Sequence, residues 1–171
     1  RCTKDKKRIY RIVPRYNESV NKYWMCDIGR YGFDFVDSDT RILNSHTKDG
    51  KNTLWNEMFS VISDRIRKIL KEYGSDSIGV IVSPQLSNED MEIAKDLFDK
   101  KLGLKNIAFI ENSLDKHKDD FLIMEDKNPN SKQVKKLGLN KVSIANIISQ
   151  IKSKKIKCLY IVESNECDNF N

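Results

Sequence analysis

The sequence Ile78-Gly79-Val80-Ile81-Val82 decides the fold of this chain. The run is apolar throughout, too short for a helix and rich in β-branched side chains, so it predicts a buried strand. Similar short apolar runs occur at residues 107–110, 121–124 and 158–162. Uniformly apolar runs are typical of parallel strands that are covered on both faces.

Helical periodicity surrounds these predicted strands. Apolar residues recur at helical spacing from Trp55 to Tyr73, and Gly74 is a suitable residue to end that helix. Ser87-Asn88-Glu89-Asp90 opens a second helix with the character of a capping box, and a third helix is predicted at residues 144–151. The residues expected to face inward from the second helix are Ala94, Leu97, Phe98 and Leu102.

The order of these elements predicts an α/β fold with a mostly parallel sheet flanked by helices. Residues 53–171 form this α/β domain, which we expect to be incomplete at its C-terminus. Residues 1–52 form an irregular, basic lobe in which aromatic, arginine and asparagine residues follow no period. Ligands of parallel sheets bind beyond the carboxyl ends of the strands. Here those ends are Ser83-Pro84, Glu111-Asn112, Glu125-Asp126 and Glu163-Ser164.

The composition is that of a globular, highly charged protein. The 171 residues are 39% hydrophobic and 33% charged, with a net charge of +6. No apolar run approaches the roughly 20 residues that cross a bilayer. Residues 1–22 hold eight basic and two acidic side chains, and residues 132–157 hold eight lysines and no acid. We interpret these stretches as solvated surface or as contacts for an acidic partner subunit. A nucleic-acid-binding module is an alternative that we do not favour.

Cysteine and histidine spacing gives no metal motif. The four cysteines are Cys2, Cys26, Cys158 and Cys167, and none forms a C-x-x-C pair, so no zinc site or redox dithiol is predicted. The low cysteine density favours a reducing compartment over a disulfide framework. His46 and His117 lie in polar stretches without Cys, Asp or Glu at ligand spacing, and we expect both to be solvated.

The remaining polar candidates favour structural roles. Asp119-Asp120 and Glu125-Asp126 flank a predicted strand, and we expect these carboxylates to be solvated or paired with lysine instead of catalytic. Ser83 and Ser164 lack the G-x-S-x-G elbow of a nucleophile. Trp24 and Trp55 are expected to lie in the core, and Arg15, Asn17 and Asn21 to hold the N-terminal loop by hydrogen bonds.

Two stretches carry a resemblance to a known family. Residues 11–31 read RIVPRYNESVNKYWMCDIGRY, and residues 119–130 read DDFLIMEDKNPN, followed by Leu137-Gly138. They resemble the large iron–sulfur subunit of bacterial NADH:quinone oxidoreductases, the respiratory complex I. That subunit is related to the molybdopterin-dependent oxidoreductases, such as formate dehydrogenase. The resemblance extends over nearly the whole chain.

The resemblance implies a part in electron transfer from NADH toward quinone, with the segment itself structural and non-catalytic. By position, Cys26 matches the fourth ligand of a [4Fe–4S] cluster whose other three cysteines lie upstream of Arg1, and Cys2 is not assigned. We therefore expect no cofactor in this chain alone, where Cys26 is expected to be a core thiol beside Trp24 and Tyr31. The implied partners are other subunits of a respiratory complex. The implied location is cytoplasmic, peripheral to the inner membrane and joined to it only through the complex.

Two sequence differences from the molybdopterin-dependent enzymes favour the resemblance to the respiratory subunit. Molybdopterin enzymes resembling this chain usually carry Lys where this sequence has Ile28, which Asp27 precedes. They also insert a long cofactor-binding domain where only about ten residues separate the predicted strand at 107–110 from Phe121. The chain has seven glycines and no G-x-G-x-x-G phosphate loop, so no molybdopterin is expected. A fragment of a molybdopterin-dependent oxidoreductase, such as formate dehydrogenase, is the alternative.

Overall fold

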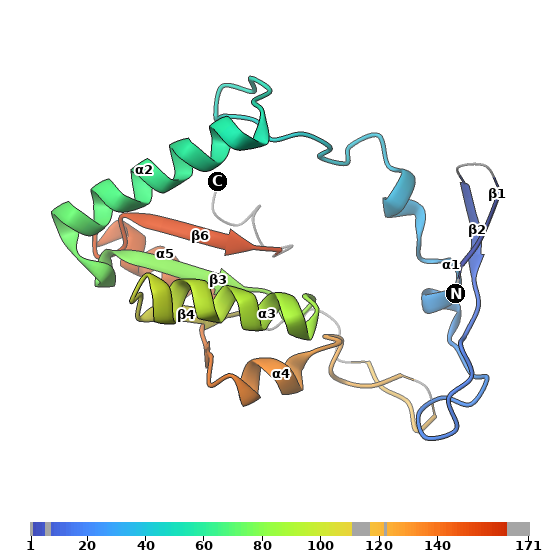
Figure 1. The fold of residues 1–171 in the computed structure, drawn as a ribbon. Helices are drawn as coiled ribbons and strands as arrows, with labels where there is room; N and C mark the ends of the chain where they lie inside the picture. Colours follow the sequence, from blue (N-terminus) through green and yellow to red (C-terminus); the bar gives the residue numbers. More distant parts are fainter. Residues whose placement is uncertain (1, 6–7, 111–116, 122, 164–171) are drawn as a thin grey trace. The chain divides into compact units, whose positions relative to one another are not determined.

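The computed structural model describes residues 2–5, 8–110, 117–121 and 123–163 (Figure 1). The chain divides into two compact units, residues 1–58 with 117–125 and residues 59–116 with 126–171. The elements are β1 (Cys2–Asp5), β2 (Arg8–Ile12), α1 (Asp27–Tyr31), η1 (Asp34–Asp37), α2 (Trp55–Tyr73), η2 (Ser75–Ser77), β3 (Ile78–Val82), α3 (Asn88–Lys95), η3 (Asp96–Lys101), β4 (Asn106–Phe109), α4 (Ser131–Lys136), β5 (Asn140–Lys141), α5 (Ile144–Lys152) and β6 (Cys158–Val162).

The second unit contains a four-stranded parallel sheet in the order β5-β4-β3-β6. In β3, Val80 lies opposite Ile107 of β4 on one side and Tyr160 of β6 on the other. Every residue of β3 is buried, because the strand is central in the sheet and has apolar side chains on both faces. The predicted α/β class, with a parallel sheet flanked by helices, is confirmed.

The two faces of the sheet have separate cores. Ile78, Val80 and Val82 point to one face, where they pack with residues of α2, α3 and α4. Ile81 points to the opposite face and packs with Ile147 of α5. This alternation follows from the two-residue period of a strand. It explains why β3 had to be apolar at every position.

The second predicted helix differs from its expected register. Ser87 caps α3 by accepting a hydrogen bond from the Asp90 amide at 3.1 Å, as predicted. The helix then continues as the π-helical segment η3, in which the Leu102 amide donates to the Leu97 carbonyl. A π turn contains an extra residue and shifts the helical face. Leu97 is therefore 42% exposed, and the expectation that it faces inward was wrong; Met91, which was not expected, is fully buried.

The predicted strand at residues 121–124 is absent from the described residues 121, 123 and 124. The Asp119 carboxylate accepts hydrogen bonds from the amides of Phe121 and Ile123 at 2.9 and 2.7 Å, and the Asp119 amide donates to the Ile123 carbonyl. These bonds close a loop, because a short acidic side chain competes with strand pairing for the backbone. Glu125-Asp126 is accordingly not a strand end, and Phe121 and Met124 are exposed.

The first unit lacks an apolar core among its described residues. β1 and β2 pair in antiparallel fashion, and β2 ends at Ile12, two residues before Pro14. No residue of 9–58 or of the described part of 117–125 is buried. Trp24 and Trp55 are 57% and 59% exposed, so the expectation that both tryptophans lie in a core was wrong. Among the helices of the described ranges, none has the length and apolarity needed to cross a membrane.

Hydrogen bonds, in place of a core, order the loop after β2. Asn17 Oδ1 accepts from the Ser19 amide at 3.1 Å, and Asn21 Nδ2 donates to the Trp24 carbonyl at 3.3 Å. The prediction that Asn17 and Asn21 hold this loop is confirmed, while Arg15 is exposed. The loop thus has a defined conformation although its side chains remain in contact with water.

Candidate functional site

Polar side chains gather where β3 ends and α4 begins. Ser83 follows β3 directly, and its Oγ accepts a hydrogen bond from the Gln85 amide at 3.1 Å. The Gln85 side chain donates to Asn128 Oδ1 at 3.4 Å. The Asn130 backbone amide donates to the Pro84 carbonyl at 3.1 Å. These bonds join residues 83–86 to residues 126–131, and we call the two joined segments the β3–α4 clasp.

Asp126 is the most highly bonded side chain of the clasp. One of its oxygens, Oδ1, accepts from the Asn128 amide at 3.0 Å, from Asn128 Nδ2 at 3.1 Å and from Ser131 Oγ at 3.0 Å. Partial desolvation would raise the pKa of Asp126, but the hydrogen bonds from Asn128 and Ser131 outweigh it and lower the pKa below its usual value. The carboxylate is therefore a structural acceptor and is not suited to act as a general acid.

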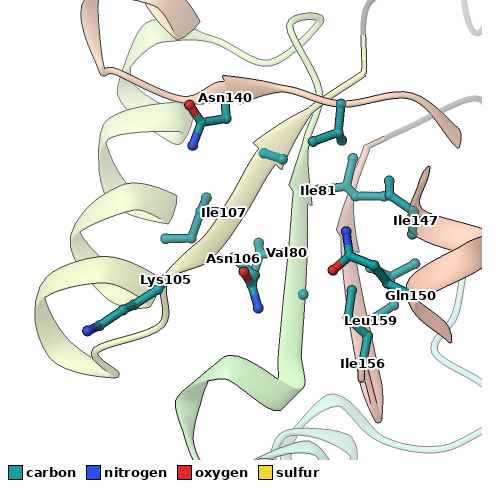
Figure 2. A pocket seen from close by; sticks show the side chains of 13 residues that line it. Val80, Ile81, Lys105, Asn106, Ile107, Asn140, Ile147, Gln150, Ile156 and Leu159 are labelled. Carbon is teal, nitrogen blue, oxygen red and sulfur yellow. The ribbon is translucent and has the colours of Figure 1, made fainter. Parts of the chain in front are cut away.

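A cavity of about 110 Å³ lies against the sheet on its α5 face (Figure 2). Figure 2 shows Ile147 and Gln150 reaching from α5 toward the strands. The lining is mostly apolar, with the amide side chains of Asn106, Asn140 and Gln150 around it. Lys105 is the one ionisable residue among the lining residues, so the cavity offers no acid–base pair for catalysis.

Cys26 lies in the first unit, apart from the clasp in sequence. It is the N-cap residue of α1, has an extended backbone and makes no side-chain capping bond. The thiol is free and half-buried. Trp24 and Tyr31, beside which a core thiol was expected, are 57% and 55% exposed. The thiol therefore lies at the edge of the unit and not within a core.

The described part of the chain contains no group of three or more His, Cys, Asp and Glu side chains that could hold a metal ion. Cys158 is free and half-buried in β6, in the second unit. Burial raises the pKa of the Cys158 thiol, and the positive charge of Arg65 opposes this in part. The side chains of Cys2 and Cys167 fall outside the described residues.

The other predicted polar candidates have structural surroundings. His46 and His117 are exposed, as predicted, and the His46 ring nitrogen Nδ1 lies 3.5 Å from the Asn44 carbonyl. Asp119 accepts from two backbone amides. Glu111, Asn112 and Ser164 lie outside the described residues. The structure thus brings together Ser83 and Asp126 of the predicted strand ends, but it does so through hydrogen bonds that hold two loops.

Sequence reasoning missed three residues of the clasp, namely Gln85, Asn128 and Ser131. Asn128 and Ser131 are 7% and 5% exposed, which is unusual for polar side chains outside a hydrogen-bond network. The run Asp126-Lys127-Asn128-Pro129-Asn130-Ser131 does contain a signal, because Asp two residues before Asn favours a turn closed by its own carboxylate. The partner loop after β3 could not be identified from that signal alone.

Comparison with known proteins finds similarity to oxidoreductases. No protein-family model matches the chain. The chain is similar to a protein named putative formate dehydrogenase of Staphylococcus aureus strain N315, with 28% identity over 108 residues, 61% of this chain. A protein of the same name from Staphylococcus haemolyticus strain JCSC1435 shows the same identity and coverage. The putative formate dehydrogenase YrhE of Bacillus subtilis strain 168 is 31% identical over 102 residues, 58% of this chain.

The matched segment is a small part of these relatives. It spans 11% of the two staphylococcal proteins and 10% of the Bacillus protein. The similarity relates the chain to oxidoreductases and agrees with the resemblance to the molybdopterin-dependent group. It fits that group better than the respiratory NADH:quinone oxidoreductase subunit.

Proposed function

We propose that this chain acts as a structural segment of a larger oxidoreductase related to the formate dehydrogenases. The observation that supports the proposal most is the similarity to putative formate dehydrogenases over 61% of the chain. The clasp supports a structural role for the α/β unit, because Ser83 and Asp126 are engaged in hydrogen bonds that hold loops at the carboxyl end of β3.

We propose further that Cys26 supplies one thiolate to a [4Fe–4S] cluster in the complete protein. A cluster of this type needs four ligands, and the described residues do not make up that set. Cys26 itself suits the part of one ligand, since its thiol is unpaired and only half-buried at the edge of the first unit. Gly29 lies beside the thiol, where an added Cβ would reach van der Waals contact with the sulfur at 3.8 Å. When bound, the cluster would supply one-electron transfer.

A second candidate is a part in the iron–sulfur subunit of an NADH:quinone oxidoreductase, among the other subunits of a respiratory complex. Ile28 and the short connection between β4 and Phe121 favour it, because molybdopterin enzymes resembling this chain carry Lys and a long insertion at these positions. In both candidates the segment itself is non-catalytic and carries no pterin of its own. Molybdenum or tungsten in the complete native protein would support the first candidate; NADH-dependent quinone reduction without either metal would support the second.

The role of Cys26 can be tested by substitution in the complete native protein. We expect Cys26→Ser to abolish or alter one iron–sulfur signal in the electron paramagnetic resonance spectrum and to lower the iron content. Cys158→Ser is a matched control, since it also removes a free, half-buried thiol, and it should leave the spectrum unchanged. An unaltered spectrum and iron content in Cys26→Ser would show that Cys26 is not a ligand.

A further inference from the structure

Exposed aromatic side chains gather on the first unit. The rings of Tyr16 and Tyr23 lie 4.6 Å apart between centroids, and those of Trp24 and Phe121 lie 5.0 Å apart in an edge-to-face arrangement. Their exposed fractions are 47%, 71%, 57% and 65% in chain order. Because Tyr23 and Trp24 are adjacent in the chain, the two pairs are linked, and we call these four residues the aromatic surface.

A groove lies beside the aromatic surface and shares Tyr16 with it. Its apolar wall is formed by Val13, Pro14, Val20 and Met25, with Val20 81% exposed. Arg15, Asn17 and Asn21 also line the groove, and hydrogen bonds of the two asparagines hold the loop that carries it. The Trp24 amide adds a further bond to the Asn21 carbonyl at 2.7 Å. A concave apolar wall and a set of rings are thus presented by one ordered loop.

The chemistry of this surface is that of a protein–protein contact. Aromatic residues and Met are enriched at such contacts, and large aromatic side chains supply most of the binding energy. Exposed apolar patches of this kind on an ordered backbone mark interaction sites more often than solvated surface. Residues 9–58, which hold the groove and three of the four rings, carry seven basic and seven acidic side chains, so this stretch has no net charge to attract a strongly charged ligand.

We propose that the aromatic surface and its groove bind an apolar polypeptide segment that lies outside these 171 residues. The inference rests on the proposed function, in which the chain works inside a larger oxidoreductase. In the matched relatives the equivalent segment is about a tenth of the protein, so most of their polypeptide lies beyond it. The occupant covers Trp24 and Tyr23 and gives the first unit the apolar contacts that its described residues lack.

Photo-crosslinking in the complete native protein tests this inference. p-Benzoylphenylalanine is placed at Trp24 and, as a matched control, at Tyr73, which is 54% exposed and lies in the second unit. We expect several-fold more crosslinked product from position 24, with peptides outside residues 1–171 identified by mass spectrometry. Crosslinks from position 24 to a second copy or to lipid, or a yield no greater than that from position 73, would overturn the inference.

A substitution separates docking from folding and from the cluster. Trp24→Lys in the complete native protein, with p-benzoylphenylalanine moved to Tyr23, should lower the yield of product crosslinked to peptides outside residues 1–171 several-fold. Circular dichroism of the complete protein should stay unchanged, because the buried residues of the described ranges lie in the second unit. An undiminished yield in Trp24→Lys would contradict the proposal. A crosslink at position 24 in a protein without iron would uphold the docking surface and refute the cluster; iron without a crosslink would do the reverse.

Discussion

Replacing Asp126 by Ala tests whether the β3–α4 clasp stabilises the α/β unit. The substitution removes the oxygen that accepts from the Asn128 amide, Asn128 Nδ2 and Ser131 Oγ. Asn128 and Ser131 are 7% and 5% exposed, so water reaches their freed donors poorly. Each buried donor left without a partner costs about 1–3 kcal/mol. Since Asp126 itself is exposed and water can replace part of the lost bonding, we expect a total loss of about 1–2 kcal/mol.

The effect of Asp126→Ala on the free energy of unfolding should depend on pH. The pKa of Asp126 is lowered in the folded chain, so its ionised form stabilises the fold above the unfolded pKa. That contribution is lost as the pH falls through the folded pKa. The difference in unfolding free energy between the native chain and Asp126→Ala should therefore shrink between about pH 5 and pH 2.

Urea unfolding followed by far-ultraviolet circular dichroism at pH 7 and pH 3 measures both effects. Glu125→Ala is the matched control, because it removes the neighbouring exposed carboxylate and should change the unfolding free energy by less than about 0.5 kcal/mol. If Asp126→Ala behaved like Glu125→Ala at pH 7, the clasp would have no measurable part in stability. An equal loss at both pH values would refute the role assigned to the ionised carboxylate.

Three further predictions concern packing, backbone and thiol reactivity. Met91→Ala should lower the free energy of unfolding in urea by about 2–5 kcal/mol, since Met91 is fully buried. Ile93→Ala on the same helix should lower it by less than about 1 kcal/mol, because Ile93 is 66% exposed. Equal losses in the two variants would refute the observed register of α3. Gly74→Ala should lower the unfolding free energy by about 1 kcal/mol, because Gly74 has a φ of +79° at the end of α2, and an unchanged midpoint would contradict this. Alkylation of Cys158 by iodoacetamide in the native chain should be slower than in the urea-unfolded chain at pH 8, since burial raises the thiol pKa, and equal rates would contradict this.

The parallel sheet was predictable from strands that are buried on both faces. β3 and β6 are apolar at successive positions because residues on both faces pack against helices, and this pattern is visible in the sequence. The run at 121–124 has the same composition but forms no strand in its described residues. There the Asp119 carboxylate binds the amides of Phe121 and Ile123, and composition alone does not reveal that competition.

The missed elements were short or irregular. β5 has two residues, and α4 has six, with Val134 as its one fully buried apolar residue. Neither is long enough to show a period. The π turn in η3 shifts the face of the second helix at Leu97, which was expected to face inward. Met91 precedes that turn, in α3, and was overlooked although it lies three residues before the buried Ala94. The exposure of Trp24 and Trp55 was unpredictable because large aromatic residues indicate burial in general but not whether the chain itself supplies the covering surface.

The role of Cys26 as a cluster ligand was inferred from the resemblance to a family and not from the spacing of cysteines. A lone cysteine at the start of the five-residue helix α1 has no chemical signature of its own. The clasp, by contrast, is defined by contacts between residues more than 40 positions apart, such as Gln85 and Asn128. Long-range pairs of this kind are set by the topology of the sheet, which the order of elements predicts only in outline.

The pairing of β3 with both β4 and β6 has a consequence for the order of folding. Gly79 pairs with Asn106, 27 residues away, whereas Ile78 pairs with Cys158, 80 residues away. Closing the longer loop costs about 1 kcal/mol more in chain entropy. We therefore expect β4 to join the central strand before β6 does, and β6 to be the first strand to detach when the chain opens locally, which makes the Cys158 thiol a natural reporter of that opening.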